Sequence, residues 1–153
     1  MRPLTVLAAI MILLTSACGG GSDDVTGTLS GNGTMTATID GKAWSSVTPA
    51  AQYKNSTLSI TGLDVSLSTS MSIGFIAAGP GTFSLALGNS ATGLAIVARG
   101  SQSWTTAGPG GTGSVTLTTL TANHAVGTFS FDAIASSGSG VTHVTNGRFD
   151  ITF

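Results

Sequence analysis

The feature that most constrains this chain is an alternation of apolar and polar side chains that recurs from residue 34 to the end. Residues 34–39 read TMTATI and residues 148–153 read RFDITF, so every second side chain is apolar. A period of two places alternate side chains on opposite faces of a β-strand, whereas an amphipathic helix needs a period near 3.6. The pattern predicts antiparallel strands with one face buried and one face toward water. The same alternation recurs at residues 57–61, 71–75, 83–87, 115–118 and 128–132.

The composition excludes a helical fold. Charged residues make up only 7% of the chain, and Glu is absent. Glu, Lys, Arg and Gln are strong helix formers, whereas the abundant Thr suits a half-exposed strand because its Cβ is branched. The 153 residues are enough to bury one core. We therefore expect one all-β domain, an antiparallel β-sandwich of about eight to ten short strands, with a small partly open β-barrel as the alternative.

Turn residues and the apolar positions between them predict the details of this fold. Asp40-Gly41 and Asn146-Gly147 are favoured dipeptides for a two-residue hairpin turn. The run from residue 94 to residue 98 is mostly apolar, so we expect a strand that is buried on both faces. The expected core comprises Met35, Ile39, Trp44, Leu58, Ile60, Ile73, Phe75, Phe83, Leu85, Leu94, Ile96, Val115, Leu117, Phe129, Phe131, Phe149 and Ile151.

Residues 1–17 resemble a bacterial lipoprotein signal peptide. A basic second residue precedes an apolar run over residues 4–14, which has the length of a signal-peptide core and is too short to span a bilayer. The run leads into LTSAC, in which small residues before a cysteine resemble a lipobox. In such signals the thiol receives a diacylglycerol, the peptide is cut before the cysteine, and the new amino terminus is acylated. Cys18 is therefore the predicted lipidation site. The alternative is an ordinary secretory signal cut near Ala17, which leaves a free thiol.

Residues 18–33 are predicted to form a tether between the lipid anchor and a folded domain over residues 34–153. They are rich in Gly and Ser and hold few apolar side chains, a composition typical of a flexible linker. Cys18 is the only cysteine, so acylation also accounts for an unpaired thiol in an exported chain. Multiple acyl chains give stable membrane attachment. Gly19 stands where an Asp would retain a lipoprotein in the inner membrane, so we expect the outer membrane, on its periplasmic face or at the cell surface.

Four segments, taken in order, resemble a family of bacterial lipoprotein domains of unknown function. The resemblance implies a lipobox, a short Gly-rich tether and one all-β domain of this size. It implies no established activity, and it carries no catalytic or binding residue over to this chain. The four segments are TATIDGKAW at 36–44, GTFSLAL at 81–87, GTFSF at 127–131 and VTNGRFDITF at 144–153.

Few residues of the chain point to chemistry. His124 and His143 are the only histidines, and two histidines without a third ligand make a poor metal site. The sequence holds no nucleophile elbow that leads into a helix, no complete phosphate-binding loop and no clustered pair of carboxylates. A formal net charge of −1 with five basic residues argues against a nucleic-acid partner. We therefore expect no catalytic residue, no cofactor, no metal and no enzymatic activity.

Two aromatic residues are candidate ligand contacts. Trp104 lies between polar neighbours near a Gly-rich loop, and Tyr53 is the second candidate, because carbohydrate-binding sandwiches stack sugars on exposed aromatic rings. The alternative for Trp104 is packing at the edge of the core. We expect a lipid-anchored cell-envelope protein that serves as a binding or structural module for a glycan or a protein. The alternative is an accessory component of envelope assembly or secretion that acts through protein contacts.

Overall fold

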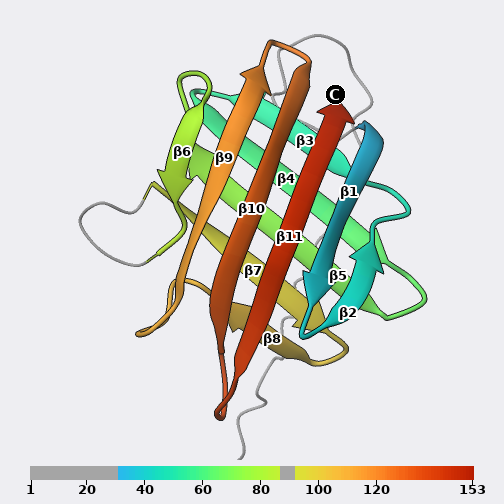
Figure 1. Ribbon diagram of the computed structural model, residues 1–153, viewed down its shortest axis with the longest axis vertical. Helices are drawn as coiled ribbons and strands as arrows, with labels where there is room; N and C mark the ends of the chain where they lie inside the picture. Colours follow the sequence, from blue (N-terminus) through green and yellow to red (C-terminus); the bar gives the residue numbers. More distant parts are fainter. Residues whose placement is uncertain (1–30, 87–91) are drawn as a thin grey trace, which may run out of the picture.

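The computed structural model describes residues 31–86 and 92–153, and these residues form eleven β-strands and no helix. All the strand pairings are antiparallel. Figure 1 shows the strands in chain order. They are β1 (Asn32–Ile39), β2 (Lys42–Ser45), β3 (Ala50–Lys54), β4 (Thr57–Asp64), β5 (Thr69–Ile76), β6 (Gly81–Ser84), β7 (Gly93–Arg99), β8 (Gln102–Thr105), β9 (Thr112–Leu120), β10 (His124–Ala135) and β11 (Val141–Thr152).

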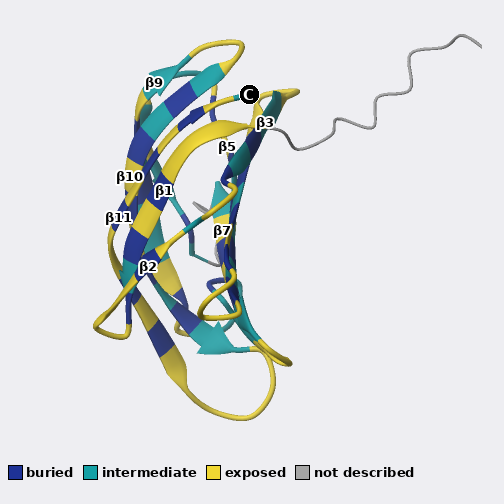
Figure 2. Ribbon diagram, turned by 90° about the vertical axis from the view of Figure 1, so that its right-hand side faces the viewer, coloured by how far each residue is buried: buried dark blue, intermediate teal, exposed yellow. Residues whose placement is uncertain are grey.

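The strands form two layers that belong to one folded-over sheet. One layer has the order β6-β9-β10-β11-β1-β2, and the other has the order β8-β7-β5-β4-β3. The layers are joined where the end of β10 pairs with β8, with Ile134 opposite Thr105 and Ala135 opposite Trp104. Figure 2 shows the layers from the side, with buried and exposed residues alternating along the strands. The sheet does not close into a barrel, so the predicted all-β sandwich is confirmed and the barrel alternative is not.

The first strand begins two residues before the predicted start of the domain at residue 34. Asn32 pairs with Thr152, and Gly33 pairs with Ile151, so the chain enters the fold beside its own last strand. Residues 1–30, which include the predicted signal peptide, Cys18 and most of the predicted tether, lie outside the described residues.

The core follows the alternation of the sequence. Phe129 and Phe131 lie on the buried face of β10 at 4% and 3% exposure, and Phe149 of β11 stacks on Phe129 with ring centroids 6.3 Å apart. Most of the expected core residues are buried, and Phe83 is half-buried against the core. Nine further hydrophobic residues that the expected core list did not name are also buried. These are Ala37, Ala51, Met71, Ala77, Ala95, Val97, Ala125, Ala133 and Val144.

The expectation that β7 is buried on both faces is wrong. Leu94 and Ile96 are 42% and 39% exposed, while Ala95 and Val97 are fully buried. The layer that contains β7, with the order β8-β7-β5-β4-β3, is covered by the other layer on one face only. A strand in this layer therefore buries every second side chain, and its other side chains face solvent even where they are apolar. The apolar run therefore presents two large aliphatic side chains to solvent.

Of the two predicted hairpin turns, one is confirmed and one is wrong. Asp40 and Gly41 connect β1 to β2 with φ angles of 50° and 79°, as a tight two-residue turn requires. Asn146 instead lies inside β11, at a bulge where its φ is 53° and the register with both β1 and β10 shifts. The next residue is Gly147, where a Cβ would lie 2.4 Å from the ring of Phe129. Asn146 therefore adopts the backbone conformation of a bulge, Gly147 leaves room for the ring of Phe129, and β11 continues past both residues.

We predict that two adjacent substitutions in β10 differ sharply in their effect on stability. Phe131→Ala removes a buried ring and should lower the free energy of unfolding by about 3–5 kcal/mol. Ser130→Ala changes an exposed residue on the opposite face and should change it by no more than about 0.5 kcal/mol. Denaturant melts of the full chain and both variants would measure this. Equal losses from the two substitutions would contradict the assigned strand register.

Candidate functional site

One pocket opens between the two layers, at the end of the sandwich where the β1–β2 hairpin lies. It has a volume of about 180 Å³, and we call it the hairpin pocket. The β1–β2 hairpin supplies one wall, and the β4–β5 turn with the end of β7 supplies the other. Its lining residues are Ile39, Asp40, Lys42, Trp44, Leu67, Thr69 and Arg99.

Asp40 joins three elements at the mouth of this pocket. Its backbone N–H donates to the carbonyl of His143 at 2.9 Å, and its Oδ1 accepts from the backbone N–H of His143 at 2.8 Å. Its Oδ2 accepts from Nη2 of Arg99 at 2.7 Å. The hairpin, β11 and β7 are therefore tied together by one side chain and its own amide, across the opening between the layers.

The Asp40 carboxyl is held in its charged form. Partial burial raises the pKa of Asp40, but the N–H of His143 and the guanidinium of Arg99 together outweigh burial and lower the pKa below its ordinary value. Both members of the ion pair are about one-third exposed, at 34% for Arg99 and 36% for Asp40. Solvent therefore screens the pair, and it fixes geometry more than it adds stability.

Trp44 forms the floor of the hairpin pocket. It is 2% exposed, and its indole N–H donates to the carbonyl of Thr69 at 3.2 Å. The ring lies close against Gly62 of β4, where a Cβ would come within 2.7 Å of the ring atom Cη2. The position of the Trp44 ring is thus set by its hydrogen bond to Thr69 of β5 and by the space that Gly62 of β4 leaves for the ring.

The loop beside the pocket is stabilised by a second carboxylate. Asp64 accepts from the Ser66 hydroxyl at 2.6 Å and from the N–H of Leu67 at 3.1 Å. The Ser66 hydrogen bond lowers the pKa of Asp64, burial opposes it, and the N–H of Leu67 and the N–H of Ser45 lower it further. These bonds hold the β4–β5 turn in place, so that Leu67 lies at the mouth of the hairpin pocket.

The structure places the two predicted ligand contacts at the edge of the core. Trp104 pairs with Val97 and is half-buried, and the Arg99 guanidinium lies over its ring with Cζ 5.3 Å from the ring centroid. Tyr53 packs against the core and donates its hydroxyl hydrogen to the carbonyl of Ala77 at 2.9 Å. Neither ring lines the hairpin pocket, and Trp104 approaches it only through Arg99.

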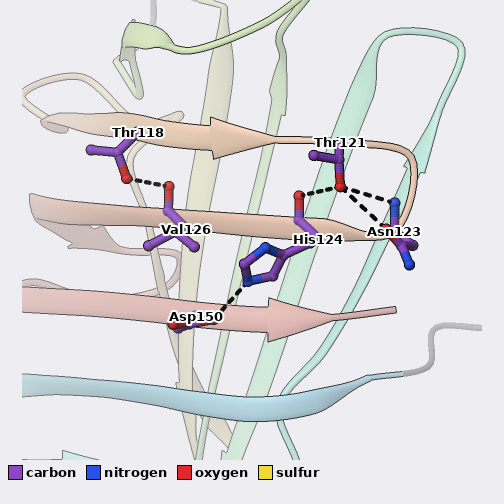
Figure 3. Close-up of polar contacts among 6 residues, drawn as sticks. All are labelled: Thr118, Thr121, Asn123, His124, Val126 and Asp150. Atoms are coloured by element: carbon purple, nitrogen blue, oxygen red, sulfur yellow. Dashed lines mark hydrogen bonds and ion pairs between the residues drawn. The ribbon is translucent and has the colours of Figure 1, made fainter.

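The two histidines lie on the outer face of β10 and β11, each beside an aspartate. Nε2 of His124 lies 2.8 Å from Oδ1 of Asp150, and Nδ1 of His143 lies 2.7 Å from Oδ1 of Asp132. Figure 3 shows the His124 ring reaching from β10 to Asp150 on β11, beside the Thr121 contacts that hold the β9–β10 turn. Both pairs are exposed cross-strand contacts, and their side chains do not line the hairpin pocket.

Within residues 31–86 and 92–153, no group of three or more His, Cys, Asp or Glu side chains could hold a metal ion. The same residues contain no helix that is long and apolar enough to cross a membrane.

The comparison with protein-family models gives one match, to a domain of unknown function (DUF6252), over residues 31–151. The chain belongs to the DUF6252 family. The matched residues cover almost the entire fold, from the start of β1 to the penultimate residue of β11, and so include the hairpin pocket of this DUF6252 domain. No curated protein and no solved structure matches the chain.

The charged residues of the hairpin pocket in this DUF6252 protein are not among the site residues predicted from the sequence. Asp40 is predicted only as a turn residue, and no role is predicted for Lys42 or Arg99. The scarcity of basic residues could have pointed to Lys42 and Arg99, because the chain has only five of them. Two of them, 57 positions apart, meet at one pocket.

We predict that acid destabilises the fold through Asp40 and Asp64. The pKa of each carboxyl is lower in the folded chain than in the unfolded chain, so the unfolded state takes up protons first as the pH falls. The free energy of unfolding should therefore decline as the pH drops below about 4. Asp40→Asn keeps a residue that tolerates the positive φ but removes the titrating group, so its stability should fall less steeply in this range.

Urea melts between about pH 7 and about pH 2.5 would measure the two slopes. Ser130→Ala serves as the control, because it changes an exposed side chain without altering charge. An Asp40→Asn slope equal to that of the unmodified chain would contradict the prediction.

Proposed function

We propose that this DUF6252 protein is a lipid-anchored binding module of the bacterial cell envelope, with the hairpin pocket as its binding site. The observation that carries the proposal is the course of β1. The strand begins at Asn32, where the predicted tether joins the fold, and it ends at Ile39, in the wall of the pocket. Eight strand residues span about 26 Å. Attachment to a membrane at one end of the domain therefore leaves the pocket free at the other end.

The predicted anchor supports the same proposal from the sequence. Cys18 follows an apolar signal-like segment, and twelve residues lie between it and the described fold. Acyl chains on Cys18 would be the membrane contact of this module, in the outer membrane on its periplasmic face or at the cell surface. A glycan or an envelope protein would be the ligand of the pocket.

We also propose that the module is not an enzyme. The two histidines, which are the residues best suited to proton transfer near neutral pH, lie on the outer face of β10 and β11. The hairpin pocket instead brings together an ion pair, one further cation and apolar side chains. Such a set suits recognition of a ligand.

The second candidate function is an accessory role in envelope assembly or secretion through contacts with another envelope protein. The observation that favours it is the outer face of β4, β5 and β7, which carries no charged side chain and exposes Ile76, Leu94 and Ile96. Covering such a face with an equally uncharged protein surface desolvates no charge. A photo-crosslinking amino acid in place of Leu94 should then give one adduct of fixed mass in cells. The same replacement of Thr128, on the opposite outer face, should give none.

We predict that Cys18 is acylated in its bacterial host. Radiolabelled palmitate should enter the full chain, and the protein should fractionate with membranes. Cys18→Ser removes the only thiol, so label and membrane association should both be lost.

The matched control is Ser22→Ala, a change of similar size within the predicted tether, which should leave labelling unchanged. Equal labelling of the unmodified chain and Cys18→Ser would overturn the lipid anchor.

A further inference from the structure

We infer that the hairpin pocket binds one six-membered sugar ring that carries a carboxylate, such as a uronic acid unit of a glycan. The inference rests on the proposed binding function and names the class of its ligand. Three features of the pocket carry it: its charge, its volume and the chemistry of its walls.

The charge of the pocket leaves one cation available. Both carboxylate oxygens of Asp40 are engaged, Oδ1 by the N–H of His143 and Oδ2 by Arg99. Lys42 lines the same pocket, is exposed, and makes no ion pair within the part of the chain that the structure describes. An anionic group entering the mouth therefore meets the free ammonium of Lys42, in a pocket that the Arg99 side chain also lines.

The volume limits the ligand to one ring. An engineered apolar cavity of about 150 Å³ accepts benzene, and the hairpin pocket measures about 180 Å³. Sites for a whole small molecule usually measure about 300–1,000 Å³. The pocket therefore fits a single ring, either free or as one unit of a longer chain that continues outside.

The walls suit a ring with one apolar and one polar side. Ile39 and Trp44 form a buried apolar floor, and Leu67, which is 45% exposed, forms an apolar wall at the mouth. A pyranose ring has a face of C–H groups and an edge of hydroxyls. The C–H face can pack on Leu67 above this floor while the carboxylate reaches Lys42.

A peptide fits this site less well than a glycan. An extended peptide would bind by adding a strand to the free edge of β2. That edge is partly occupied by the end of β4, because the N–H of Ser45 donates to Oδ2 of Asp64 at 3.5 Å. Just beyond β2, the N–H of Val47 donates to the carbonyl of Leu63 at 2.9 Å. The pocket itself remains open, so its occupant must enter from the mouth.

The test is a titration of the full chain, labelled with ¹⁵N and held in detergent micelles, with D-galacturonic acid. D-galactose has the same ring without the carboxylate, and acetate has the carboxylate without the ring. We expect galacturonic acid to shift the amide signals of Lys42, Leu67 and Thr69 and the indole N–H signal of Trp44, with a dissociation constant in the millimolar range. Galactose and acetate should each bind at least about tenfold more weakly.

Lys42→Gln should weaken galacturonic acid binding about tenfold, as expected for the loss of one charge-assisted hydrogen bond. The matched control is Lys54→Gln, which removes an exposed charge on β3 and should leave binding unchanged. An otherwise unaltered amide spectrum verifies the fold of each variant.

Four results would overturn the inference: no shifts with galacturonic acid, shifts located away from the pocket, equal binding of galactose or acetate, or unchanged binding by Lys42→Gln. Such a failure is distinguishable from failure of the proposed lipid anchor. Loss of acylation at Cys18 would remove the membrane attachment and leave this titration unaffected.

Discussion

The arrangement of the two layers at the pocket end depends on the hydrogen bonds of Asp40. Its backbone and carboxylate exchange two bonds with the backbone of His143, and the remaining oxygen holds Arg99. Arg99 in turn covers the ring of Trp104 on β8, the strand that joins the layers. A single turn residue thus links the β1–β2 hairpin to both halves of the sandwich. The mouth of the hairpin pocket has its shape because these contacts coincide there.

Much of the fold could be predicted from the sequence because its strongest signal is local. Alternation assigns each side chain to a face, so the all-β sandwich and most of its core, including Phe129 and Phe131, follow from the period of two. The wrong predictions concern local patterns that are compatible with two different structures. Leu94 and Ile96 are apolar as core residues are, yet they lie on an uncovered face. Asn146-Gly147 has turn chemistry, yet β1 and β10 pair on both sides of it and continue the strand.

The hairpin pocket could not be predicted because its residues are distant in the chain. Asp40 and Arg99 are 59 positions apart, and Asp40 and His143 are 103 positions apart. No alternation or short motif encodes such contacts, which depend on the strand order and on the register of β7 and β11. The predictions of ligand contact at Trp104 and Tyr53 rest on residue type and, for Trp104, on its polar neighbours in the sequence. The structure shows their polar or exposed parts engaged by Arg99 and by the carbonyl of Ala77.

Amide hydrogen exchange at His143 tests most directly whether Asp40 holds the hairpin to β11. The side chain of His143 is exposed, but the backbone N–H of His143 donates to Asp40, so we expect slow exchange in the unmodified chain. Asp40→Gly keeps the positive φ accessible while removing the acceptor, and exchange at His143 should accelerate at least about tenfold. Asp150→Gly removes only a side-chain partner of His124, so exchange of the His143 N–H should remain slow in this variant. Fast exchange at His143 in the unmodified chain, or an equal rate in Asp40→Gly, would show that Asp40 does not hold the hairpin to β11.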